Sequence, residues 1–170
     1  MSPRRDGIGG RARAIRLLLS DVDGVLTDSG VYYTDGGELL RRFSLRDGMG
    51  VERLRELAGV ETGFVTGERS AAVRNRAEKL LITEIHLEAR DKEGVLEEIL
   101  GRRGLAPREV AYIGDDVNDL AVIRRVGLAA CPADAVLQVK RAVHIVCESA
   151  GGHGAFREFA EILIAAREEE

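Results

Sequence analysis

Apolar residues along the chain follow two spacings, which predict two kinds of element. The consecutive leucines at 17–19 are typical of a buried strand, whereas Val51, Leu54 and Leu57 have helical spacing. We expect strands at 15–20, 61–67, 82–88, 109–115, 128–133 and 144–148, and helices at 47–60, 70–80, 91–104, 118–127, 135–142 and 156–166. Because strands and helices alternate, the sequence predicts an α/β fold with a doubly wound, mostly parallel sheet covered by helices on both faces.

One segment departs from this alternation. Residues 31–43 hold two β-rich arms around Asp35, Gly36 and Gly37, which is typical of a protruding β-hairpin. The chain shows no internal repeat, linker or low-complexity segment, and 170 residues suit one domain with its own core. We expect that domain over 15–170, preceded by a mobile basic arm over 1–14.

Composition limits the partners. The formal net charge is −4, aromatic residues make up 4% of the chain and tryptophan is absent, so no surface for nucleic acid is expected. No apolar run approaches the ~18 residues of a membrane span, so no membrane partner is expected either. Cys131 and Cys147 lie in apolar stretches, as reduced core cysteines do, and we expect a cytoplasmic protein.

Polar side chains gather where the predicted strands end. They are Asp21 and Asp23 after the first strand, Thr66 after the second, Lys92 at the start of the helix after the third, and Asp115, Asp116 and Asp119 after the fourth. Since ligands of such sheets bind at the carboxyl ends of the strands, these groups are expected to converge on one edge.

The chemistry of this set indicates a metal and a phosphate. Grouped carboxylates repel one another unless a cation neutralises them, and oxygen ligands favour Mg²⁺, which accepts phosphate as a co-ligand. Lys92 adds one positive charge, and the Thr66 hydroxyl can donate to a phosphoryl oxygen. Together with a carboxylate nucleophile they would form a phosphoryl-transfer site.

Other sites agree less well with the sequence. A calcium loop needs an acid and a glycine near the positions that Val25 and Leu26 occupy. The glycines within 7–10 precede the first strand, so they are no dinucleotide fingerprint, and the motifs of P-loop, serine-hydrolase and zinc-protease sites are absent. The three histidines, His86, His144 and His153, are scattered.

Four motifs together resemble those of the haloacid dehalogenase superfamily. They are D-V-D-G-V-L-T from residue 21, the strand-end Thr66, Lys92, and G-D-D-V-N-D from residue 114, in matching order over residues 15–160. The resemblance implies that Asp21 attacks phosphorus to form an aspartyl-phosphate. It also implies that Asp23 protonates the leaving alcohol and then activates water.

The same resemblance implies how metal and phosphate are held. The Mg²⁺ ligands would be Asp21, the backbone carbonyl of Asp23, and Asp115. The phosphate would contact Thr66, Gly67 and Lys92. Around the ligands would lie Asp116, Asn118 and Asp119, with Asp119 orienting the metal's waters or Lys92.

The resemblance also favours a phosphatase without a cap domain. Superfamily members that lack the second aspartate of the first motif do other chemistry, so Asp23 favours a phosphatase, or else a mutase. Many relatives carry a cap inserted between these motifs, but residues 24–63 have room only for the hairpin and one helix. Residues 67–91 hold one helix and one strand. A large substrate or neighbouring subunits would then have to exclude water.

A narrower resemblance concerns the substrate. The stretches from 21 (D-V-D-G-V-L-T-D-S-G-V-Y-Y), 43 (F-S-L-R-D-G-M-G), 67 (G-E-R-S) and 151 (G-G-H-G-A-F-R-E-F) are similar to the group of 3-deoxy-D-manno-octulosonate 8-phosphate phosphatases. The group implies a phosphorylated 2-keto-3-deoxy sugar acid as substrate, a place in lipopolysaccharide synthesis, and a homotetramer. Its hairpins, here 31–43, pair between subunits, and the segment 151–158 would reach a neighbouring subunit. That segment could instead be only a helix-entry loop.

Six residues are candidates for substrate contact. Arg46, Asp47 and Gly48 would border the substrate, or would only cap the following helix. Glu68, Arg76 and Lys79 resemble the pattern of relatives that act on nonulosonate 9-phosphates, although all three could lie on an exposed helix face. The eight-carbon substrate is favoured on group-wide grounds, with the nine-carbon substrate as the alternative.

A function of another class stays open. The chain could be a noncatalytic tetramerising module, as the tails of sialic acid synthetases can be, although the complete set of motif residues argues against it. Capless relatives that repair nucleic-acid ends or dephosphorylate proteins fit less well, because the chain is acidic and lacks their insertions.

Overall fold

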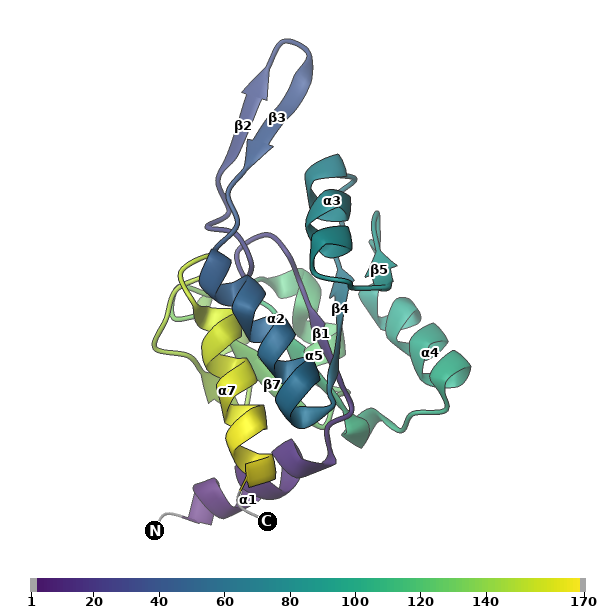
Figure 1. Cartoon of the computed structure of the whole chain (residues 1–170), viewed down its shortest axis with the longest axis vertical. Coiled ribbons are helices and arrows are strands. Elements are labelled where there is room, and N and C mark those ends of the chain that lie inside the picture. Colours follow the sequence, from purple (N-terminus) through teal and green to yellow (C-terminus); the bar gives the residue numbers. More distant parts are fainter. Residues whose placement is uncertain (1–2, 169–170) are drawn as a thin grey trace.

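The computed structural model describes residues 3–168 and has a six-stranded sheet at its centre (Figure 1). Its strands are β1 (Leu17–Ser20), β4 (Glu61–Val65), β5 (Glu84–His86), β6 (Val110–Ile113), β7 (Leu128–Cys131) and β8 (Ile145–Val146). They lie in the order β5-β4-β1-β6-β7-β8, and each neighbouring pair is parallel. The predicted fold class is confirmed.

Helices cover both faces of this sheet. They are α1 (Pro3–Ala14), α2 (Leu45–Ala58), α3 (Ala71–Lys79), α4 (Lys92–Arg103), α5 (Leu120–Ile123), α6 (Leu137–Lys140) and α7 (Ala155–Glu168). Residues of α1, α2, α3 and α7 pack into one half of the core, and residues of α4, α5 and α6 pack into the other. Within residues 3–168, no helix is long and apolar enough to cross a bilayer.

The leucine run of β1 divides the core into these two halves. Leu18 faces the half that holds Phe156 and Phe159 of α7, while Leu17 and Leu19 face the half that holds helix α4. Successive side chains of a strand point to opposite faces, so a continuous apolar run marks a strand that is buried on both sides. Both cysteines are buried and free, as predicted.

Two predicted helices are shorter than expected. The helix expected at 118–127 is reduced to α5, because a 3₁₀ turn (Val117–Asp119) precedes it. The chain also leaves the helix before Gly127, whose N–H donates to the carbonyls of Pro107 and Val110. Helix α6 likewise covers only the middle of the range 135–142, around the buried Val139.

The basic segment 1–14, expected from the sequence as a mobile arm, is helical over the part that the structure describes. Residues 3–14 form helix α1, which lies against α7 at the end of the molecule opposite the hairpin (Figure 1). Ala12 is buried, Ile8 packs against the core, and Arg11 Nη1 donates to the Gly127 carbonyl over 2.8 Å. Apolar side chains of this basic segment therefore contact the same core as α7.

The predicted hairpin is formed by β2 (Val31–Thr34) and β3 (Gly37–Arg41), which pair antiparallel with a register shift between Tyr32 and Tyr33. It projects away from the sheet (Figure 1). Tyr33 is 67% exposed, and Tyr32 and Leu40 are exposed as well. Apart from this hairpin, residues 3–168 form no inserted domain that could act as a cap.

Helices α2 and α7 are joined by one buried carboxylate. Asp47 is 1% exposed, and its two oxygens accept the N–H groups of Gly154, over 3.3 Å, and Arg157, over 3.0 Å. These N–H groups lie at the start of α7, where a helix leaves donors without partners of its own. Helix α2 is capped by Ser44 instead, so Asp47 caps a neighbouring helix and not its own.

Replacing Asp47 with alanine should therefore destabilise the fold. We expect Asp47→Ala to lower the free energy of unfolding by about 2 kcal/mol, or the melting temperature by about 4–8 °C, because it leaves two buried donors unpaired. Thermal unfolding followed by circular dichroism measures this. Glu56→Ala, an exposed site on the same helix, is the control and should change little. An unchanged melting temperature for Asp47→Ala would contradict the capping role.

Candidate active site

The predicted polar groups meet at the carboxyl edge of the sheet. A cavity of about 410 Å³ opens there. Its lining residues are Asp21, Asp23, Ser29, Thr66, Gly67, Glu68, Asp115, Asp116, Val117 and Asn118. Most of the motif residues named from the sequence therefore line one cavity, although they come from the ends of three different strands.

The loop after β1 places the first two aspartates. The Asp21 N–H continues the ladder by donating to the Ile113 carbonyl over 3.0 Å, and the chain then turns back on itself around Val22. Thr27 Oγ1 accepts the N–H of Gly24 within this loop. Gly24 has φ of +84°, and a β-carbon there would collide with the Asp115 carboxylate. A glycine is therefore needed for both the turn and the close approach.

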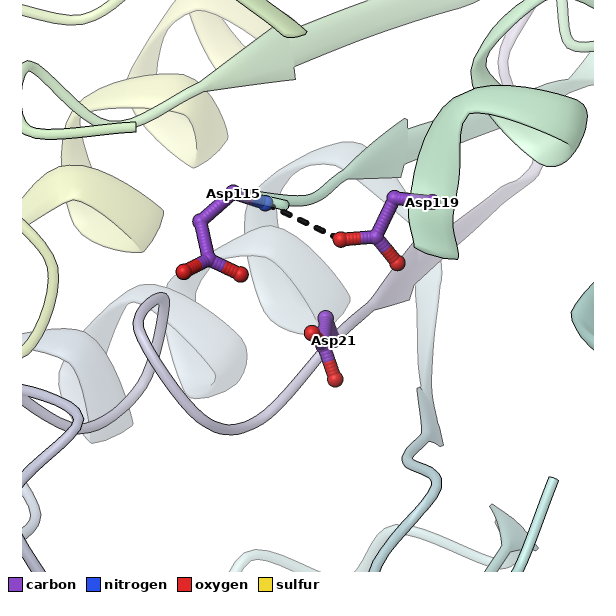
Figure 2. A group of neighbouring side chains, drawn as sticks. All are labelled: Asp21, Asp115 and Asp119. Carbon is purple, nitrogen blue, oxygen red and sulfur yellow. Dashed lines mark hydrogen bonds between the residues drawn. The ribbon is translucent and has the colours of Figure 1, made fainter. Parts of the chain in front are cut away.

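Three carboxylates, of Asp21, Asp115 and Asp119, lie close together at this edge of the sheet (Figure 2), and the first two also line the cavity. One oxygen from each of Asp21, Asp115 and Asp119 lies within 4.8 Å of the other two. Burial and then the charge of Asp119 raise the pKa of Asp21 well above its usual value. The same two causes, in the same order, raise the pKa of Asp115 to about 7. The donors and their mutual repulsion fit a divalent cation with oxygen ligands.

The carboxylate oxygens of Asp119 already accept four hydrogen bonds. Its Oδ1 accepts from the Tyr112 hydroxyl over 2.6 Å and from Lys92 Nζ over 2.7 Å. Its Oδ2 accepts the N–H groups of Asp115, over 3.0 Å, and Asp116, over 3.4 Å. These four donors leave Asp119 little capacity for a metal, so Asp21 and Asp115 are the side chains best placed to bind one.

Lys92 lies between two of these carboxylates. Its Nζ is 3.0 Å from Asp21 Oδ1 and 2.7 Å from Asp119 Oδ1, and its side chain is 1% exposed. Burial alone would lower the pKa of Lys92, but the charges of Asp21 and Asp119 outweigh it and the pKa is raised. Lys92 is therefore a fixed ammonium group, held at the start of α4, which Asp91 caps.

Thr66 and Gly67 follow β4. The Thr66 N–H donates to the His86 carbonyl over 2.9 Å, and its Oγ1 accepts the N–H of Glu68 over 3.1 Å. The hydroxyl proton is then free to point into the cavity that Thr66 lines. Asp116 and Asn118 also line the cavity, and Asp116 caps the 3₁₀ turn through the N–H of Val117.

Asp23 has a partner that the sequence motifs did not reveal. Arg41 Nη1, from the hairpin, donates to both Asp23 oxygens over 2.9 and 2.8 Å. Burial raises the pKa of Asp23 and outweighs the lowering by Arg41. Arg41 belongs to none of the motifs, and only the path of the hairpin brings its side chain to Asp23.

Five of the six candidate substrate residues lie away from this cavity. Only Glu68 lines it. Arg76 Nη2 donates to the Ser44 carbonyl over 3.0 Å, and a β-carbon on Gly48 would collide with the same guanidinium. Asp47 caps α7, while Arg46 and Lys79 are exposed. A substrate role for these residues therefore stays a prediction, and within one chain it lacks support from the geometry.

Comparisons with known proteins agree with this geometry. The sequence model of the haloacid dehalogenase-like hydrolases matches residues 58–159. The 3-deoxy-D-manno-octulosonate 8-phosphate phosphatase of Yersinia pestis is 37% identical over 98% of this chain and 88% of its own length. The chain therefore belongs to the haloacid dehalogenase-like hydrolases.

Two solved structures extend the comparison. The phosphatase of the same name from Moraxella catarrhalis, in complex with a magnesium ion, a phosphate ion and KDO, is 32% identical over 95% of this chain and 92% of that one, with a TM-score of 0.91. The cobalt-bound deoxy-D-mannose-octulosonate 8-phosphate phosphatase from Haemophilus influenzae is 34% identical over 93% and 92%, with a TM-score of 0.89.

Metal binding should stabilise the protein in a pH-dependent way. A carboxyl group with a raised pKa favours the folded state while protonated, and this contribution is lost as pH rises through the folded-state pKa. For Asp115 the loss spans its ordinary value of 3.8 to about 7. In EDTA we therefore expect the melting temperature to fall from about pH 5 to about pH 8. Excess Mg²⁺ should restore about 4–8 °C at the higher pH and much less at the lower.

Differential scanning calorimetry with EDTA or Mg²⁺ at both pH values measures these shifts. The control is Asp115→Asn, which should lose the Mg²⁺ shift and flatten the pH dependence. Equal stability with and without Mg²⁺ at the higher pH would contradict a metal site at these carboxylates.

Proposed function

We propose that the chain is a Mg²⁺-dependent phosphatase that hydrolyses 3-deoxy-D-manno-octulosonate 8-phosphate to 3-deoxy-D-manno-octulosonate and phosphate. The observation that carries the proposal is the placement of Lys92 between Asp21 and Asp119, next to a cavity that Asp21, Asp23, Thr66 and Asp115 line. The substrate named for the relatives supports the eight-carbon sugar acid.

The residues present would divide the reaction into two steps. An Asp21 oxygen attacks phosphorus as the bond from phosphorus to the sugar oxygen breaks, and a proton moves from Asp23 to that leaving oxygen. Asp23 then takes a proton from water as the water oxygen attacks the aspartyl-phosphate and releases Asp21 and phosphate. Lys92 and the Thr66 hydroxyl orient the phosphoryl oxygens throughout.

Asp21, the Asp23 carbonyl and Asp115 would hold a Mg²⁺ ion, which would supply positive charge to offset the charge of the phosphoryl oxygens. In this proposal Asp119 binds Lys92 and not the metal. It fixes the ammonium group at the position where it meets both the nucleophile and the phosphate.

We further propose a homotetramer in the cytoplasm that serves lipopolysaccharide synthesis. The cavity lining holds neither arginine, lysine nor histidine. The nearest cations, Lys92 and Arg41, are each paired with two carboxylates of their own chain, so neither is left for a sugar-acid carboxylate. Such a cation would come from a neighbouring subunit, which would also exclude water from the open site. The exposed apolar side chains of hairpin 31–43 suit pairing between subunits. Most of segment 151–158 is buried in its own chain, but His153 is exposed and available for a contact with a neighbouring subunit.

Phosphate release tests the enzymatic proposal. With Mg²⁺, we expect faster release from 3-deoxy-D-manno-octulosonate 8-phosphate than from a nonulosonate 9-phosphate, because the former is the substrate named for the relatives. Asp21→Asn should lower turnover by roughly 10³-fold or more with an unchanged circular dichroism spectrum, since it removes the nucleophile.

Each other outcome has a distinct meaning. Faster release from the nonulosonate 9-phosphate would show that the proposed substrate is wrong and would give Glu68 a role in specificity. Release from neither substrate, with no response to EDTA, would favour a noncatalytic module. Full activity of Asp21→Asn would refute the nucleophile assignment.

The oligomeric state can be tested separately. Light scattering coupled to size exclusion should give four times the chain mass of 18.5 kDa. Tyr33→Glu, which puts a charge on the exposed hairpin, should give smaller species, whereas Leu137→Glu, an exposed apolar site on α6, should stay tetrameric. A monomeric wild-type protein at micromolar concentration would refute the tetramer.

A further inference from the structure

Arg41 connects the hairpin to the carboxyl group that is proposed to act as acid and base. Its side chain is 1% exposed, although it belongs to a hairpin whose other arm is largely open to solvent. Nη1 contacts both oxygens of Asp23, and Nη2 donates to Glu38 Oε2 over 2.9 Å. One guanidinium therefore binds two carboxylates from different parts of the chain.

A second set of contacts extends this connection to the loop after β4. Glu68 Oε2 lies 3.7 Å from Arg41 Nη2, and the Ser70 hydroxyl donates to Glu38 Oε1 over 2.8 Å. Glu68 lines the cavity, and Ser70 precedes α3. The guanidinium of Arg41 thus connects the loop after β1, the hairpin and the loop after β4, next to the cavity that Asp23 and Glu68 line.

The charges around Arg41 make it hard to replace. Three carboxylates, Asp23, Glu38 and Glu68, face one guanidinium, and the pair that it forms with Asp23 is largely shielded from water. Breaking a buried pair on one side leaves the other charge uncompensated, which costs more than the pair contributes. Without Arg41, the Asp23 side chain would turn away from the two acidic neighbours and leave its present position.

We propose that Arg41 is a positioning residue for the reaction, which fixes Asp23 where it can exchange a proton with the leaving oxygen of the substrate. The geometry allows this because a carboxyl group has two oxygens. Nη1 contacts both of them in the structure; when Asp23 is protonated, Arg41 keeps one as an acceptor, and the other carries the proton that moves to the sugar oxygen as its bond to phosphorus breaks. The inference rests on the proposed role of Asp23 and assigns to the hairpin a part in the chemistry.

The leaving group distinguishes this role from a general structural one. An alkyl phosphate such as the octulosonate 8-phosphate releases a basic alkoxide that needs a proton, whereas p-nitrophenyl phosphate releases a stable phenolate that does not. The ratio kcat/KM reports only the steps up to release of this group, before water is activated. A mispositioned acid should therefore affect the alkyl substrate far more.

The experiment compares kcat/KM for both substrates in the wild type, Arg41→Gln, Arg41→Lys and Asp23→Asn. We expect Arg41→Gln to lose about 10²-fold on the alkyl phosphate and less than about 3-fold on the aryl phosphate. Arg41→Lys keeps the charge without the planar fork and should recover part of the loss. Arg125→Gln is the matched control. Arg125 also binds two carboxylates, Glu93 and Glu97, but outside the cavity lining, and its loss should leave both substrates unaffected.

The outcomes separate the inference from the function on which it rests. Absence of phosphate release by the wild type, or equal losses on both substrates for Asp23→Asn, would refute the proposed function or the role of Asp23. If Asp23→Asn shows the dependence on the leaving group and Arg41→Gln does not, the function stands and the positioning role fails. Unfolding of both Arg41 variants would likewise overturn it, since Arg41 would then serve the fold.

Discussion

Mutual repulsion of carboxylates at one edge of the sheet is the constraint around which this molecule is built. The protein offsets it with one buried ammonium, since Lys92 contacts both Asp21 and Asp119. Tyr112 belongs to the same arrangement. Its ring is fully buried among the residues packed on α4, and its hydroxyl reaches up to Asp119. The hydrophobic core and the polar site thus share a residue, and a change in core packing beneath β6 would be transmitted to the position of Lys92.

The segment that starts at Gly151 packs against the loop after β1, at the same edge of the sheet. Gly152 has φ of +68° and donates its N–H to the Val25 carbonyl over 2.8 Å. A β-carbon on Gly151 would collide with the carbonyl of Gly24. These glycines therefore allow the segment to lie directly against the loop that carries Asp23. Asp47 fixes its other end, so α2 and α7 hold the loop in place although neither helix lines the cavity.

The sequence predicted what depends on strand order and on local spacing. The apolar runs gave the parallel sheet, and polar residues at the ends of those runs, such as Asp21, Thr66 and Asp115, meet in one cavity because parallel strands end on the same side. It could not predict contacts between elements that are remote in the chain. Arg41 meets Asp23 only through the path of the hairpin, and Asp47 meets α7 across 107 residues. The packing of α1 was not predicted either. Its sequence is rich in arginine and glycine, and of its described side chains only Ile8 and Ala12 contact the core, so it shows no clear apolar face.

The packing of α1 against α7 has a practical consequence. Arg167, near the end of α7, donates to the Ile15 carbonyl just before β1 begins, so the described ends of the chain lie together at the amino edge of the sheet (Figure 1). The cavity opens at the carboxyl edge. A fusion partner, an affinity handle or an attachment to a solid support at either end would therefore project away from the mouth of the cavity, and the chain could be immobilised with its reactive edge facing the solution.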